Sequence, residues 1–267
     1  MHTALRERAA EALFEANRTR QPIPPLVETY EDIDVTDAYE IQLLTVKKWL
    51  ADGRIVKGHK VGLSSAAMQR QMGVNQPDYG HLFADQFYLE NMPIPLDEHI
   101  QPRLEPEIAF VLRKDLAGPY VTLPDAIDAV AYVLPSLEVV DSRIQDWRIG
   151  IVDTIADNAS GGGVILGGPP RRLEGLDLRL VGCTMYRNGR IVGTGAGGAV
   201  LGSPLNSLVW LANTLGRFGV TLEAGNVILP GSVMRAIDIA PGDRVTAQFG
   251  GLGSVTAVFA GNEGAAA

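Results

Sequence analysis

The first fifty residues are patterned as helices. Apolar residues recur every three or four positions in two stripes: Leu5, Ala9 and Leu13, then Tyr39, Leu43, Val46 and Leu50. This spacing places each stripe on one face of an amphipathic helix. Prolines at positions 22, 24 and 25 end the first helix, because proline cannot continue one. We expect the second helix to have Thr36 as its N-cap and to end before Gly53.

The later part of the chain is patterned mostly as β-structure. Apolar runs bounded by turn residues predict strands over residues 55–63, 103–112, 137–140, 227–229, 244–249 and 255–259. Asn188-Gly189 is a strong signal for the turn of a β-hairpin. One helical stripe interrupts this pattern and is ended by Pro135: Leu123, Ile127, Val130 and Leu134.

Two carboxylates lie in the strand predicted over residues 103–112. Side chains alternate along a strand, so Glu105 and Glu107 share one face, roughly 7 Å apart. A third carboxylate, Glu138, interrupts an apolar strand in which a free charge would be costly. Three hard oxygen ligands without a neighbouring Cys or His favour Mg²⁺ or Mn²⁺ over Zn²⁺. The alternative is an edge strand carrying two solvated glutamates.

Lys60 and Asp78 are the other candidates for chemistry. Lys60 shares its strand face with Gly58 and Gly62, which project no side chain, so its ammonium has open space above the sheet. It is either an active-site cation or an ordinary surface lysine. Asp78 lies in the tight turn Gln76–Gly80, where it either bonds its own turn or is presented as a catalytic carboxylate.

Composition narrows the class of protein. The 267 residues include 46% hydrophobic and 20% charged residues, which is typical of a globular domain with a substantial core. A formal net charge of −8 and the absence of a basic stripe argue against a nucleic-acid partner. The single cysteine, Cys183, excludes an intramolecular disulfide and a multi-cysteine zinc site. Without an apolar leader or an apolar run of the ~18 residues that a membrane span needs, we expect a soluble, cytoplasmic protein.

Several short segments together resemble the fumarylacetoacetate hydrolase superfamily and, within it, the 2-keto-4-pentenoate hydratase branch. They run in the family's order across nearly the whole chain: Lys60–Leu63, Gln76–Gly80, Glu105–Phe110, Leu137–Val140, Asp157–Ser160 and Ile228–Ser232. The Glu-x-Glu pair with a later Glu is typical of the superfamily. The segments around Lys60 and Asp78 indicate its hydratase and decarboxylase branch.

The resemblance implies an α+β fold with a mixed β-roll core and a smaller helical N-terminal part. We expect an N-terminal helical or αβ part over residues 1–75 and a metal-binding, β-rich catalytic domain over 76–262. Residues 263–267 are expected to form a disordered tail.

The resemblance also implies the chemistry of the site. Mg²⁺ or Mn²⁺ is held by the three glutamates named above, Lys60 and Asp78 serve proton transfer and water positioning, and Ser160 and Ser232 bind substrate. The implied reaction adds water to 2-hydroxypenta-2,4-dienoate (2-oxopent-4-enoate) and gives 4-hydroxy-2-oxopentanoate, in meta-cleavage catabolism of aromatic or steroid rings. Which of Lys60 and Asp78 is the acid stays open.

Two other functions fit the same residues. One is 4-oxalocrotonate decarboxylase of the same family, which shares this site; the other is a catalytically silent partner subunit. A six-carbon diacid would need a cation for its second carboxylate, and Arg143, Arg148 and Arg235 are candidates that we expect at the surface. The resemblance further implies a homo-oligomer, in some relatives a decamer, and leaves association with a downstream aldolase open.

Overall fold

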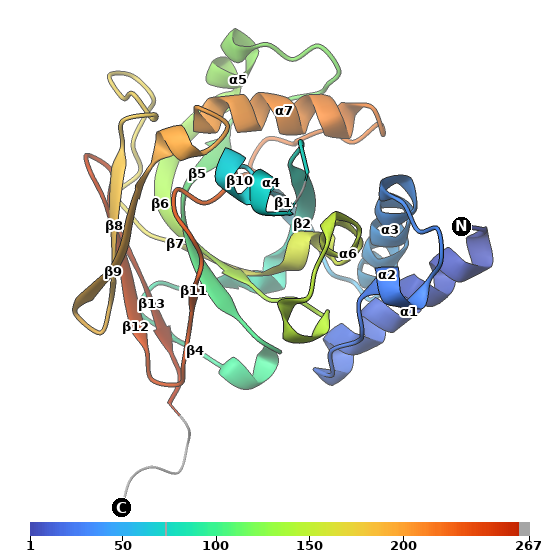
Figure 1. Ribbon diagram of the computed structural model, residues 1–267. Helices are drawn as coiled ribbons and strands as arrows, with labels where there is room; N and C mark the ends of the chain where they lie inside the picture. The colour runs from blue at the N-terminus through green and yellow to red at the C-terminus, as the bar shows by residue number, and fades with distance from the viewer. Residues whose placement is uncertain (73, 262–267) are drawn as a thin grey trace, which may run out of the picture.

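Two β-sheets form the centre of the molecule (Figure 1). The computed structural model describes residues 1–72 and 74–261, and within these residues one sheet has eight strands and the other five. The larger sheet runs in the order β2 (Asp78–Phe83), β1 (Val56–Gly62), β10 (Val227–Leu229), β5 (Arg103–Leu112), β6 (Val130–Val140), β7 (Gly161–Leu166) and β3 (Phe87–Tyr88), with β11 (Ile237–Asp238) also paired to β5. The smaller runs in the order β4 (Pro93–Ile94), β13 (Gly253–Phe259), β12 (Arg244–Phe249), β8 (Gly182–Arg187) and β9 (Arg190–Ala196).

Parallel and antiparallel pairs are mixed in both sheets. Strand β1 lies parallel to β10 and antiparallel to β2, while β5 and β6 form a long antiparallel pair. The larger sheet curls around the middle of the molecule, and the smaller sheet packs on one side of it (Figure 1). The predicted α+β fold of the fumarylacetoacetate hydrolase type, with a mixed β-roll core, is confirmed.

Most of the helices lie on one side of the sheets or across one end of them (Figure 1). The helices are α1 (Thr3–Thr19), α2 (Leu26–Thr29), α3 (Val35–Ala51), α4 (Ala66–Met72), α5 (Leu123–Ala129), α6 (Ile151–Ala156) and α7 (Pro204–Gly216). Helices α1 and α3 pack with α6 around a small apolar cluster that includes Leu13, Ile41 and Ile155. No helix in residues 1–72 and 74–261 is long and apolar enough to cross a membrane.

The main core lies between the two sheets and α7. Its position explains which face of β5 carries Glu105 and Glu107. Leu104, Ile108 and Phe110 alternate along β5 and pack into this core. The residues between them, including Glu105 and Glu107, therefore point to the opposite face. That face is the inside of the curled sheet.

Two predicted boundaries are wrong. Helix α3 takes its N-cap from Asp34, not Thr36, because the Asp34 side chain accepts from the Asp37 amide and the Asp37 side chain accepts from the Asp34 amide. The helix predicted up to Pro135 ends at Ala129, and β6 begins at the next residue. Pairing with β5 and β7 outweighs the helical spacing of this apolar run, which is rich in β-favouring residues.

The division of the chain at residue 75 stays a prediction. Strand β1, which falls in the predicted N-terminal part, is hydrogen-bonded into the larger sheet between β2 and β10. The tail predicted over residues 263–267 lies outside the described residues.

Candidate functional site

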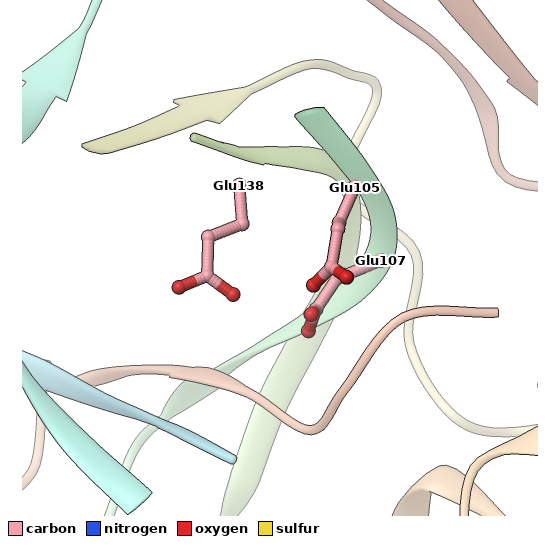
Figure 2. Close-up of side chains that lie close together, drawn as sticks. All are labelled: Glu105, Glu107 and Glu138. Atoms are coloured by element: carbon pink, nitrogen blue, oxygen red, sulfur yellow. The ribbon is translucent and has the colours of Figure 1, made fainter. Parts of the chain in front are cut away.

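Three glutamates meet on the inner face of the larger sheet. Glu105 of β5 lies directly opposite Glu138 of β6, and Glu107 follows two residues later on the same face. One carboxylate oxygen from each lies within 4.8 Å of the others. Figure 2 shows Glu138 facing the other two across a common space. The alternation of a strand and the register of one antiparallel pair are sufficient to bring these carboxylates together.

This cluster is buried and carries unsatisfied acceptors. Glu107 and Glu138 are fully buried, while Glu105 is partly exposed. Glu107 Oε2 accepts a hydrogen bond of 2.8 Å from the Gly231 amide. Among the described residues, Glu107 Oε1 and Glu138 Oε2 have no hydrogen-bond partner. Buried carboxylate oxygens without donors are costly, so the cluster needs a cation or protons to be stable.

The pKa values of the three glutamates are also shifted by their burial and by their closeness to one another. Burial raises the pKa of Glu138 to about 7, although the Lys60 ammonium lowers it, and Glu105 adds to the rise. Burial, with the charges of Glu138 and Glu105, raises the pKa of Glu107 well above its usual range. Burial also raises the pKa of Glu105. The three groups therefore hold protons more tightly than ordinary glutamates do.

Lys60 is the buried cation of the site. Its Nζ donates a hydrogen bond of 2.7 Å to the Ala159 carbonyl and lies 3.2 Å from Glu138 Oε1. Burial lowers the pKa of Lys60, but the surrounding carboxylates, led by Glu138 and Asp78, outweigh it and raise the pKa above its usual value. The residue is 2% exposed, so Lys60 is not a surface lysine.

Asp78 lies beside this lysine and opposite Gly62. Asp78 Oδ2 accepts a hydrogen bond of 2.9 Å from the Thr154 hydroxyl, and Oδ1 is buried without a partner among the described residues. Burial raises the pKa of Asp78, against the opposing effects of the Lys60 charge and the Thr154 hydrogen bond. Gly62 makes room for it, since a Cβ at Gly62 would lie 2.2 Å from Asp78 Oδ1. The aspartate does not simply close its own turn.

A cavity of about 580 Å³ opens over these side chains. Its lining includes five of the predicted site residues: Lys60, Asp78, Glu105, Ser160 and Ser232. The Ser160 hydroxyl donates 3.2 Å to Asp157 Oδ2, and the Ser232 hydroxyl donates 2.6 Å to the Met234 carbonyl. The other two predicted site residues, Glu107 and Glu138, join the cavity-lining Glu105 in the carboxylate cluster.

The donor set fits a divalent metal ion. Three carboxylates converge with unpaired oxygens, and no Cys or His takes part in the cluster. Hard oxygen ligands of this kind suit Mg²⁺ or Mn²⁺. Ionised carboxylates with oxygens within 4.8 Å of one another repel, and a dication would offset this repulsion. Glu105, Glu107 and Glu138 could therefore hold such an ion.

The outer part of the cavity carries arginine and aromatic groups. Arg103 stacks over the Trp147 ring at 4.5 Å and pairs with Asp238 at 2.8 Å. Arg235 is exposed and lines the same cavity. The expectation that Arg235 lies at the surface therefore agrees with its exposure, and its position at the cavity gives it access to a ligand.

Arg143 departs from the expected surface position. It is 2% exposed, and its guanidinium pairs with the Asp157 carboxylate. The same guanidinium donates to the carbonyls of Asp141, Asp157 and Gly161. Because these groups occupy its donors, Arg143 is not free for a substrate carboxylate. Arg148 is exposed and pairs with Glu28, as a surface residue would.

Two functional contacts were missed by sequence reasoning. The Thr154 hydroxyl and the Ala159 carbonyl hold Asp78 and Lys60. A polar Thr154 inside the apolar run of α6 was a weak signal for a buried role. No side-chain pattern could indicate the direction of a backbone carbonyl.

Comparison with known proteins agrees with this geometry. The family model described as fumarylacetoacetate (FAA) hydrolase C-terminal matches residues 48–260. The chain belongs to the fumarylacetoacetate hydrolase family. The match spans every strand of the larger sheet and all three glutamates.

Two relatives in this family are similar to the chain over nearly its whole length. The chain is 46% identical over 258 residues to the 2-keto-4-pentenoate hydratase of Paraburkholderia xenovorans (strain LB400), covering 97% of this chain and 96% of that protein. It is 43% identical over 256 residues to the 2-oxo-hept-4-ene-1,7-dioate hydratase of Escherichia coli, covering 94% and 96%.

A similar solved structure is 4-oxalocrotonate decarboxylase from Pseudomonas putida G7, complexed with magnesium and adipate. It superposes with a TM-score of 0.93 at 37% identity and covers 97% of this chain and 98% of that one. The likeness to this magnesium complex extends over nearly the whole fold, including the strands that carry the glutamates.

Proposed function

We propose that this protein is a metal-dependent hydratase. It adds water to 2-hydroxypenta-2,4-dienoate, the enol of 2-oxopent-4-enoate, and forms 4-hydroxy-2-oxopentanoate in the meta-cleavage catabolism of aromatic or steroid rings. The observation that carries the proposal is the buried glutamate cluster with Lys60 and Asp78 beside it, in a chain 46% identical to a 2-keto-4-pentenoate hydratase.

The three glutamates provide the metal site in this proposal. Mg²⁺ or Mn²⁺ held by Glu105, Glu107 and Glu138 would act as a Lewis acid toward the 2-oxo group of the substrate. The Gly231 amide fixes the orientation of Glu107 by its hydrogen bond to Oε2. This leaves the unpaired Oε1 free to be a ligand.

Lys60 and Asp78 divide the proton transfers. From the dienol, the enol hydroxyl gives up a proton and C5 gains one; the oxygen of water then bonds to C4, C3 gains a proton and the water gives one up. We assign delivery of protons to carbon to Lys60, because its ammonium is the buried cation of the site and the residue lines the cavity. Asp78 Oδ1, which has no partner among the described residues, accepts the proton of the water. Positioned groups of this kind typically contribute 10²–10⁴-fold in rate.

Two serines and two apolar residues of the cavity lining complete the proposed binding site. Ser160 and Ser232 line the cavity beside the charged groups, and their hydroxyls are held by Asp157 and by the Met234 carbonyl. We assign them to substrate binding. A five-carbon acid needs little beyond an apolar wall at its far end, which Ile149 and Val233 supply.

Decarboxylation of 4-oxalocrotonate is the second candidate. Two observations favour it: the likeness to the decarboxylase at a TM-score of 0.93, and the position of Arg235 on the cavity, where a guanidinium could pair with a second carboxylate. Identity is higher to the hydratase, at 46% against 37%. We therefore propose hydration as the reaction and keep decarboxylation as the alternative.

One experiment separates the two reactions. Purified, Mg²⁺-loaded protein is offered the five-carbon dienol and 4-oxalocrotonate, while dienol absorbance, 4-hydroxy-2-oxo acid and CO₂ are followed in parallel. We expect rapid loss of the dienol with formation of the hydroxy-oxo acid and no CO₂. Rapid CO₂ release from 4-oxalocrotonate, with the dienol untouched, would instead establish the decarboxylase.

We further infer a cytoplasmic homo-oligomer that acts on a small-molecule substrate. The support is the family to which the chain belongs and its net charge of −8, which disfavours binding to nucleic acid. Association with a downstream aldolase would follow from a place in the same pathway.

A further inference from the structure

The segment Asn158–Ser160, between α6 and β7, has an unusual backbone. Asn158, Ala159 and Ser160 have φ values of +53°, +50° and +53°. The left-handed region is unfavourable for L-residues, and runs of several such residues are rare. The segment therefore keeps this shape only because its surroundings hold it.

The Asn158 side chain provides one such restraint. Its Oδ1 accepts a hydrogen bond of 2.7 Å from the His81 amide, and its Nδ2 donates one of 2.9 Å to the His81 carbonyl. Strand β2 is an edge strand, so this amide takes the place of a neighbouring strand at His81. The approach is close because Gly80 has no Cβ; one there would lie 2.3 Å from the Asn158 carbonyl oxygen.

Arg143 holds the two ends of the same segment. Its guanidinium donates to the Asp157 carbonyl on one side and, at 3.0 Å, to the Gly161 carbonyl on the other. The ends are thus restrained by Arg143, while the turn itself is tied to the sheet through Asn158. We call residues 158–160 the left-handed turn.

The left-handed turn aims a carbonyl at the lysine of the site. The Ala159 carbonyl accepts the 2.7 Å hydrogen bond from Lys60 Nζ, and Glu138 lies 3.2 Å from the same nitrogen. Lys60 is a long, flexible side chain, and these two acceptors on different elements fix the position of its ammonium. If the turn relaxed to ordinary φ values, the carbonyl would point elsewhere.

We propose that Asn158 is a positioning residue for the hydration reaction. Its hydrogen bonds to His81 of β2 hold the left-handed turn in place. The turn thereby fixes the Lys60 ammonium through the Ala159 carbonyl. The inference rests on the proposed function of Lys60. It assigns no contact with substrate to Asn158, which acts through Lys60 alone.

The test uses Asn158→Gly in the full-length, Mg²⁺-loaded protein. Glycine adopts positive φ without strain, so this variant removes the side-chain hydrogen bonds to the His81 backbone and the 3.3 Å contact with His81 Nδ1 without forbidding the backbone conformation. We expect kcat for the five-carbon dienol to fall at least tenfold, while KM and the Kd for Mg²⁺ change less than threefold. Asn158→Asp keeps the acceptor for the His81 amide but places an oxygen against the His81 carbonyl; it should also lower kcat and serves if the glycine variant does not fold.

A double-mutant cycle shows whether the effect passes through Lys60. In the Lys60→Met background, Asn158→Gly should lower kcat no further. An additive loss, or a rise in KM with kcat unchanged, would overturn the positioning role.

Asn188→Gly is the matched control. Asn188 also has a positive φ of +54°, and its side chain also donates one hydrogen bond and accepts one, to Asp243 and from the Arg244 amide. It lies in the β8–β9 hairpin, away from the cavity lining. We expect it to lower the melting temperature without changing kcat. An equal fall in kcat in this control would show that the effect is only general loss of stability.

A structural readout separates this proposal from the proposed function. In a crystal structure of Asn158→Gly, Lys60 Nζ should have left hydrogen-bond distance of the Ala159 carbonyl. Retention of that hydrogen bond would overturn the inference, whatever the activity. A wild-type protein without activity on the dienol would fault the proposed function, while the crystal structure would still decide the role of Asn158.

Discussion

Glu138 is a carboxylate inside an apolar strand, and its neighbours determine its chemistry. It faces Glu105 across the β5–β6 pair and Lys60 from β1, and it is fully buried. That Glu105 and Glu107 share a face could be predicted from strand alternation alone. Their closeness to Glu138 could not be derived from the residues, because it depends on the register with which β5 and β6 pair.

Glu107→Gln should affect metal binding and stability in opposite directions. The amide oxygen can still accept from the Gly231 amide, but one charge of the cluster is lost. We expect Mg²⁺ affinity to fall by about 100-fold or more, as expected for loss of a ligand. The metal-free protein should become more stable, most at high pH where the carboxylates are ionised, because repulsion in the cluster decreases.

Calorimetric titration with Mg²⁺ and thermal unfolding of the chelated protein measure both effects. The exposed Glu174→Gln is the control with the same chemical change. Unchanged Mg²⁺ affinity in Glu107→Gln would remove this residue from the metal site.

The pKa of Glu138, raised by burial to about 7, predicts how pH affects metal binding. Metal ligands must be deprotonated, so Mg²⁺ affinity should fall as pH decreases below 7, by about tenfold per pH unit for each proton displaced. The effect of pH on the folding stability of the metal-free protein has the opposite sign. Because the folded pKa exceeds the unfolded value, the metal-free protein should lose stability as pH rises through 7.

Thermal unfolding of chelated protein between pH 5.5 and 8.5, with Mg²⁺ titrations over the same range, checks both trends. A melting temperature that rises with pH in the metal-free protein would contradict the assignment of a raised pKa to the glutamate cluster.

At the scale of elements, β1 and β2 bring Lys60 and Asp78 together. Gly62 and Asp78 are direct partners in this antiparallel pair. Sequence patterns located many of the elements, and strands 227–229 and 244–249 have the predicted bounds. They failed at residues 130–135, where sheet pairing decides between helix and strand. They also could not show the left-handed turn: Asn158 tolerates a positive φ, but Ala159 and Ser160 rarely adopt one.

Gly62→Ala tests the close fit of these two strands. The new Cβ would lie 2.2 Å from Asp78 Oδ1, so the carboxylate must move. We expect at least a tenfold loss of kcat with a fold that remains intact by circular dichroism. Gly182→Ala in β8 is the matched control, because its nearest neighbouring atom would lie 4.0 Å away. Wild-type kcat in Gly62→Ala would show that the position of Asp78 is not critical.

At the scale of the whole molecule, self-association is predicted from the family. Several large apolar side chains are exposed on the single chain, among them Leu89, Tyr120 and Leu180, at 74%, 90% and 79%. Light scattering at micromolar concentration should give a mass well above the 28.6 kDa of one chain. A mass of one chain would refute this prediction.

The parallel pairing of β1 with β10 has a consequence for how the protein folds. It joins residue 58 to residue 227, and the cavity forms only after this pairing has brought Lys60 and the glutamates into one sheet. Contacts between distant parts of a chain close large loops at an entropic cost, and such topologies fold slowly. The metal site is therefore expected to mature late on the folding pathway. An ion that recognises all three carboxylates would stabilise the finished protein rather than guide its early collapse.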